Sequence, residues 1–235
     1  MPSPAERELV RHLERGGALH AERAASADFA AALDRLADWQ AHRLRNTYAD
    51  LARNPRYRDA ISFFGSDLYG AGDFSRRDAD LARVVPIMAK MLPEGVLATV
   101  AGAMELSVLS QELDRGLLAR LDSAEPLSVA SYCEAYRAGD ARAGRARQIA
   151  LIMSVGRALD RYVRKPLVQS ALSAMRRPAR LAGFGALQDF LERGFSAFGT
   201  MHGAEEFLSI VEARETALMD AILSGHPAPF PEPSR

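Results

Sequence analysis

The segment Val96–Leu109, VLATVAGAMELSVL, decides the fold class of this chain. Apolar or small residues occupy nearly every side of a helix drawn through it, and Glu105 is its only charged residue. A helix that is apolar all round is buried on all sides. Pro93 provides a favourable helix start. We therefore predict that residues 93–121 form the central helix of the protein.

The rest of the chain has helical patterns as well. It contains no alternating β-branched run and no Asn-Gly or Asp-Gly turn. We predict an all-α fold, in which a single globular domain (residues 1–225) has about eight to ten helices around helix 93–121. A proline-rich tail follows at 226–235. The other predicted helices cover 4–16, 28–52, 55–68, 75 onward with a kink at Pro86, 126–137, 140–165, 166–175, 184–198 and 203–224.

Composition excludes several classes of protein. Apolar residues make up 48% of the 235, so the chain is not disordered, and 30 basic residues balance 30 acidic ones. Zero net charge argues against a generic nucleic-acid or membrane binder. The single cysteine, Cys133, excludes an internal disulfide and a cysteine-based zinc site. No signal peptide and no run near the roughly 20 apolar residues of a membrane span is recognised, so we expect a cytoplasmic protein.

The segment Pro55–Val84, PRYRDAISFFGSDLYGAGDFSRRDADLARV, holds the most distinctive residues. Asn54 and Pro55 form a favourable helix start, and an apolar face follows at helical spacing. Two glycines end that helix. The pattern from Ser75 to Asp78 is then typical of a capping box that opens the next helix. One hypothesis is a capped corner tied by ion pairs, and the other is a polar pocket beside two phenylalanines.

The same residues carry a family resemblance. Phe63–Tyr69, FFGSDLY, resembles the heptapeptide that names the bacterial FFLEELY motif proteins. Gly65, Ser66 and Asp67 stand where the name has Leu-Glu-Glu, so only the second acid is kept. The resemblance extends across most of the chain and implies an uncharacterised bacterial helical protein with no established activity. It continues at Gly70, Asp73-Phe74, Arg77-Asp78, Arg83, Pro86, Glu105-Leu106 and Arg214-Glu215.

Glu105 is the best candidate for a catalytic group, because burial among apolar neighbours raises a carboxyl pKa unless an arginine or backbone donors reach it. In the pocket hypothesis Glu105 transfers protons and Arg77 holds an anion. In the structural hypothesis Glu105 is paired with an arginine such as Arg83. The residues assigned to the pocket or motif are Phe63, Phe64, Asp67, Tyr69, Asp73, Arg77, Asp78, Arg83 and Glu105.

Metal, cofactor and nucleophile signals are weak. No Glu-x-x-His occurs, so a ferritin-like di-iron site is not supported. His202 beside Glu205 and Glu206 is better explained as a turn residue before a helix, and His20 is expected to face solvent. Phosphate-loop, dinucleotide and Gly-x-Ser-x-Gly motifs are also lacking. We expect no metal and no cofactor.

Basic residues are concentrated in one segment. Residues 137–180 contain eleven basic and two acidic residues, a net charge of +9, so the remaining chain carries −9. Arg157, Arg161, Arg164 and Lys165 could form a face for an anion or an acidic partner. Alternatively, the basic segment docks on the acidic remainder of the chain.

The leading functional hypothesis is a non-enzymatic cytoplasmic protein that acts through protein–protein interaction or self-association. A small-ligand-binding protein or enzyme with the pocket described above is the alternative. Nucleic-acid binding through residues 157–165 is a weaker alternative, and no membrane association is expected.

Overall fold

The computed structural model describes residues 2–68, 74–122 and 126–233. Within them eleven α-helices and one π-helix form a single compact unit without strands, which confirms the predicted all-α class. The helices are α1 (Pro4–Ala24), α2 (Ala27–Thr47), α3 (Ala49–Arg53), α4 (Arg58–Phe63), the π-helix η1 (Phe64–Leu68), α5 (Ser75–Met91), α6 (Glu94–Leu118), α7 (Val129–Ala138), α8 (Arg142–Val163), α9 (Pro166–Leu181), α10 (Gly185–Gly199) and α11 (Glu205–Leu223).

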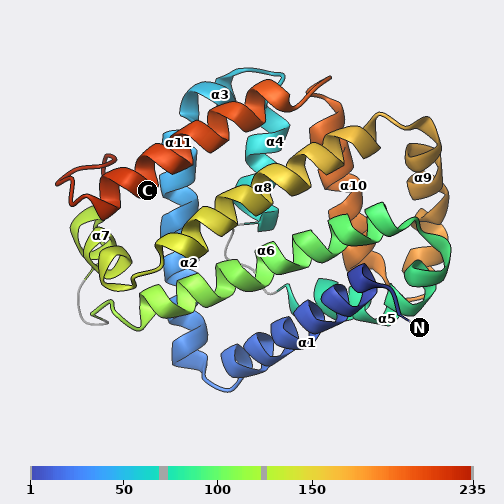
Figure 1. Cartoon of the computed structure of the whole chain (residues 1–235), viewed down its shortest axis with the longest axis horizontal. Coiled ribbons are helices and arrows are strands. Elements are labelled where there is room, and N and C mark those ends of the chain that lie inside the picture. Colours follow the sequence, from blue (N-terminus) through green and yellow to red (C-terminus); the bar gives the residue numbers. More distant parts are fainter. Residues whose placement is uncertain (1, 69–73, 123–125, 234–235) are drawn as a thin grey trace.

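Helix α6 crosses the middle of the molecule between α1 and α8 (Figure 1). It also contacts α2, α5 and α7. By length and composition alone it would pass as a membrane-crossing helix, a test that the core helix of a soluble protein passes too. Its position between other helices is that of the predicted central helix.

Helices α8 and α11 approach closely at Gly156. A Cβ atom added there would lie 2.6 Å from Cδ2 of Leu208, which is fully buried. Met153 and Phe207 are buried beside this contact in the largest apolar cluster of the described residues. A larger residue at position 156 would therefore force Leu208 or the helices to shift.

The predicted helix start at Pro55 is wrong. Residues 54–57 form a turn, and α4 begins at Arg58 with Tyr57 as its N-cap residue. The side chain of Asn54 stabilises the turn, because its Oδ1 accepts a hydrogen bond from the Arg56 backbone N–H at 3.0 Å.

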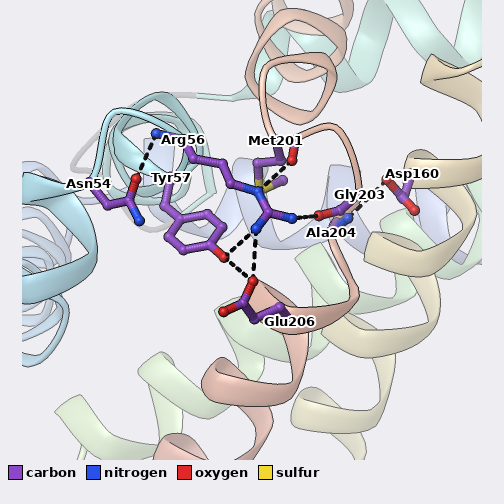
Figure 2. A network of polar contacts seen from close by, with 8 residues as sticks. All are labelled: Asn54, Arg56, Tyr57, Asp160, Met201, Gly203, Ala204 and Glu206. Carbon is purple, nitrogen blue, oxygen red and sulfur yellow. Dashed lines mark hydrogen bonds and ion pairs between the residues drawn. The ribbon is translucent and has the colours of Figure 1, made fainter.

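The Arg56 side chain extends from this turn to the segment before α11 and is hydrogen-bonded there (Figure 2). Its guanidinium donates to the carbonyl oxygens of Met201 (2.7 Å) and Gly203 (2.9 Å) and to the carboxylate of Glu206 (2.8 Å). The Tyr57 hydroxyl donates to the same carboxylate at 2.6 Å. These bonds tie the α3–α4 corner to the α10–α11 turn, where Gly203 has the positive φ of +130°.

Helix α9 extends beyond residue 175, where the predicted helix ends, and passes through Pro178. A proline inside a helix removes one backbone hydrogen bond but does not have to end the helix. The helix ends at Leu181, and Gly183, two residues later, has a φ of +83°. The N–H of Phe184 then donates to the carbonyl of Ala179 at 2.8 Å, which is the hydrogen bond of a glycine C-cap.

The described part of the C-terminal tail (226–233) is not helical, and it is packed against the domain. Phe230 is only 8% exposed, and its ring lies 6.0 Å from that of Trp39 and 6.2 Å from that of Tyr132. Glu232 accepts a hydrogen bond from the backbone N–H of Val129 at 2.9 Å. The described part of the tail thus covers the start of α7.

We expect Gly156→Ala to destabilise the protein by about 1–3 kcal/mol, because the new methyl group overpacks the α8–α11 contact. The measurement is urea denaturation followed by circular dichroism. Gly17→Ala is the matched control, because no atom outside its own helix lies within 4 Å of a Cβ there. That control should be neutral or stabilising by up to about 1 kcal/mol. Equal stability of the two variants would contradict the steric argument.

Candidate functional site

Phe63 and Phe64, which open the FFGSDLY heptapeptide, pack against the core: Phe63 is buried and Phe64 is half-buried. The Phe63 ring lies 5.5 Å from that of Phe190 on α10. The Phe64 ring lies 6.4 Å from that of Phe198 on α10 and 5.8 Å from that of Phe207 on α11. The pair therefore anchors α4 and η1 to the two C-terminal helices.

Asp78 forms the centre of a buried polar corner. Its side chain is 6% exposed; Oδ1 accepts a hydrogen bond from Arg77 Nε at 2.8 Å, and Oδ2 lies 2.9 Å from His20 Nε2. His20 comes from α1 and is 14% exposed, so the expectation that it faces solvent is wrong. The cause is tertiary, because α5 packs against α1 and places a carboxylate beside the imidazole.

Aromatic rings enclose the guanidinium of Arg77. It lies 4.6 Å from the Phe74 ring centre and 4.8 Å from the Phe190 ring centre, distances typical of cation–π contacts. Its Nη2 reaches Ser107 Oγ on α6 at 3.5 Å. Arg83 makes a similar contact with Phe184 at 4.7 Å and pairs with Asp80 at 3.9 Å. Both arginines thereby join α5 to the segment around α10.

The capping box expected at Ser75 is not formed at the start of α5. Phe74 is the N-cap residue, no side chain caps the helix there, and Asp78 binds Arg77 and His20. Tyr69 and Asp73 lie outside the described residues, as does the side chain of Asp67.

Glu105 pairs with Arg147 of α8 rather than with Arg83. Its two carboxylate oxygens accept from Nε and Nη2 of Arg147, both at 2.8 Å. The arginine lowers the pKa of Glu105, although partial burial acts in the opposite direction. A carboxylate held in this way is a poor proton-transfer group near neutral pH.

Glu105 and the residue of α6 that Arg77 contacts lie on different faces of that helix. Arg77 reaches Ser107, and residues two apart on an α-helix point in nearly opposite directions. The cavity that borders Phe64 and Gly65 is about 30 Å³ in volume and is lined mainly by apolar side chains of α2, α8 and α11. The described residues therefore do not assemble the expected pocket of Arg77, Asp78 and Glu105.

Many arginines of the 137–180 segment pair with acids outside it. Arg157 contacts Glu205 and Glu212 of α11, while Arg164 pairs with Asp160 within α8. Arg161 and Lys165 have no ion pair within the described ranges. The other pairs to acids outside the segment are Arg142–Asp220, Arg147–Glu105, Arg176–Glu192 and Arg180–Asp189. The geometry therefore favours the alternative in which the basic segment docks on acidic parts of the same chain.

Sequence reasoning missed the exposed face of α9. Leu167 is 86% exposed, Met175 52% and Leu181 90%, which is unusual for large apolar side chains. The helix packs on α10 and α8 with one side only and lies at the edge of the molecule (Figure 1). A signal was present, since Leu167, Ala171, Ala174, Pro178 and Leu181 follow a spacing of four and three residues.

In the part of the chain that the structure describes, no group of three or more histidine, cysteine, aspartate or glutamate residues is placed to hold a metal ion. His202 lies in the α10–α11 turn with a φ of +50°.

Comparison with known proteins gives one family. The family model described as "Domain of unknown function (DUF8198)" matches residues 19–229, which is most of the chain. The chain belongs to the DUF8198 family. No curated protein and no solved structure matches it. The matched range includes His20, Asp78 and all of α9.

We expect Asp78→Asn to cost about 2–4 kcal/mol of unfolding free energy, because Arg77 would keep a buried charge without its carboxylate. Glu105→Gln should cost less than about 1 kcal/mol, since Arg147 is largely in water. The measurement is chemical denaturation of the wild type and both variants, from which their unfolding free energies are compared. A fully stable Asp78→Asn protein would argue against a structural role for the corner.

The contribution of Glu105 should depend on pH. Because its pKa is lowered in the folded protein, the carboxylate stabilises the fold above its unfolded pKa. That stabilisation is lost as the pH falls through the folded pKa. We expect wild type and Glu105→Gln to differ in melting temperature at pH 7 and to converge only in acid, below the lowered pKa of Glu105. A difference that persists or grows in acid would contradict the Arg147 pairing.

Proposed function

We propose that this protein acts by binding another protein through the exposed face of α9. The observation that carries the proposal is the exposure of Leu167, Met175 and Leu181 on a helix whose other side is packed. A contiguous group of exposed apolar side chains on a protein surface often marks an interaction site.

The spacing of the face favours a helical partner. Leu167, Ala171, Ala174, Pro178 and Leu181 are all exposed, and the alternation of four and three residues is that of a helix–helix seam. The alanines between the leucines would let a partner helix approach closely. The seam extends over most of the length of α9.

Charge favours an acidic partner over a second copy of this chain. Every charged residue of α9 is basic. Arg176 and Arg180 are paired with Glu192 and Asp189 of α10, whereas Arg177 has no ion pair with any described residue. Arg161 and Lys165 provide further unpaired cations just before the helix. Two copies joined at α9 would place arginines against arginines, which opposes self-association.

The other functional hypotheses gain less support from the geometry. Pairing of Arg157 and Arg164 with carboxylates weakens the case for nucleic-acid binding, and the pairing of Glu105 weakens the case for an acid–base enzyme. We retain the resemblance to the bacterial FFLEELY motif proteins and the cytoplasmic location as proposals, which rest on sequence alone.

The proposal can be tested by site-specific cross-linking. A photo-reactive amino acid is placed at Leu181 or Met175 in the native host, with Val10 as the control because it is an exposed apolar residue on α1. We expect the same protein adduct from both α9 positions and not from position 10. That protein is then purified and titrated with wild type and with the double variant Leu167→Ser/Leu181→Ser.

Replacing two leucines that the partner would cover should weaken binding at least about tenfold, whereas Val10→Ser should leave it unchanged. Arg177→Glu should weaken binding more at low salt than at high salt. Adducts only to a second copy of this chain, adducts only to lipid, or unchanged affinity of the double variant would each overturn the proposal.

A further inference from the structure

A small polar cavity lies where α2, α7, α8 and α11 meet the C-terminal tail, at the end of the molecule opposite α9 (Figure 1). Its volume is about 40 Å³. One water molecule needs about 10–15 Å³ measured in this way, so the cavity has room for a group of about three or four non-hydrogen atoms. Arginine, tyrosine and glutamine side chains and the carboxylate of Glu215 share its wall with apolar side chains.

Arg145 is the unusual residue of this cavity. The residue is 8% exposed, its guanidinium stacks at 4.6 Å on the Tyr136 ring, and it donates one hydrogen bond to Gln148 at 3.3 Å. No carboxylate of the described residues forms an ion pair with it. A buried arginine normally has such a partner, because an unpaired buried charge is costly.

Two hydroxyl groups are also available. Tyr132 and Tyr136 are 3% and 9% exposed, and neither hydroxyl has a hydrogen-bond partner in the described part of the protein. No side-chain nitrogen or oxygen that is sealed from water lacks a partner among the described residues. The two hydroxyl groups and the free N–H groups of Arg145 are therefore accessible to water. Burial raises the pKa of both tyrosines, so both remain hydrogen-bond donors at neutral pH.

The acids near the cavity are already engaged. Glu215 accepts from Arg43 and from Tyr48, both at 2.8 Å. Asp114 accepts from Gln40 at 2.9 Å, and burial raises the pKa of its carboxyl in spite of Arg145. One cation, that of Arg145, is left without a direct partner.

We propose that this cavity binds the carboxylate of a small organic acid. Arg145 would neutralise the carboxylate, and the hydroxyls of Tyr132 and Tyr136 would donate hydrogen bonds to its oxygens. A planar carboxylate suits the planar guanidinium, and the volume fits an acid of the size of formate or acetate. This inference is independent of the α9 face.

The tail closes the site. Phe230 belongs to the cavity wall and packs on Trp39 and Tyr132, while Glu232 is hydrogen-bonded to the start of α7. A larger acid would have to displace Phe230. Trp39, the single tryptophan of the chain, lies 4.6 Å from the Tyr132 ring and so reports on the cavity by its fluorescence.

The test is titration of the full chain with sodium formate and sodium acetate, followed by Trp39 fluorescence. Sodium chloride and sodium phosphate are run at matched ionic strength. The key variant is Tyr132→Phe/Tyr136→Phe, which keeps both rings and removes only the hydroxyls. Arg145→Gln is the second variant, and Arg142→Gln, an exposed arginine of the same helix, is its control.

We expect a saturable response to formate or acetate in wild type and in Arg142→Gln. The double tyrosine variant should bind at least about tenfold more weakly, because two hydrogen bonds are lost. Equal affinity of the folded double variant, a response to phosphate but not to carboxylates, a response no greater than that to chloride, or no saturable response would each overturn the proposal.

Discussion

The close contact between α8 and α11 at Gly156 is the constraint on which the rest of the structure depends. Because a side chain at this position would collide with Leu208, the two helices can lie near enough to bury Met153 and Phe207 between them. The start of α11 is then within reach of Arg56, whose guanidinium binds the preceding turn. Helix α8 also packs on α6, where Gly102 lies against Val155.

Polar groups are used in two ways in this fold. Pairs near the surface, such as Glu105–Arg147, join neighbouring helices at little energetic cost or gain. Buried groups are more demanding, because each charge removed from water needs a partner. Asp78 has two partners, whereas Arg145 has none of opposite charge within ion-pair distance. We therefore interpret the surroundings of Asp78 as structural, and we propose the surroundings of Arg145 as a ligand site.

The sequence predicted most helices but located the candidate site poorly. Helix 93–121 was recognisable because apolar residues surround it, and α6 occupies the core as expected. Glu105 was chosen for its apolar neighbours in sequence, yet its environment is set by Arg147, 42 residues away. His20 and Asp78 are separated by 58 residues, so no local pattern could reveal their contact. The spacing of α9 was readable, but its exposure depended on which helices cover it.

The sequence by itself determined where helices form, because capping residues, glycines and the 3.6-residue period act within a few positions of the chain. It also determined that the charges balance and that one segment is strongly basic. Only the tertiary structure decided which carboxylate each arginine meets, which side of α9 stays in water and which tyrosines surround Arg145. Those outcomes depend on distances between helices that are remote in sequence, and such distances are fixed by packing of the whole core.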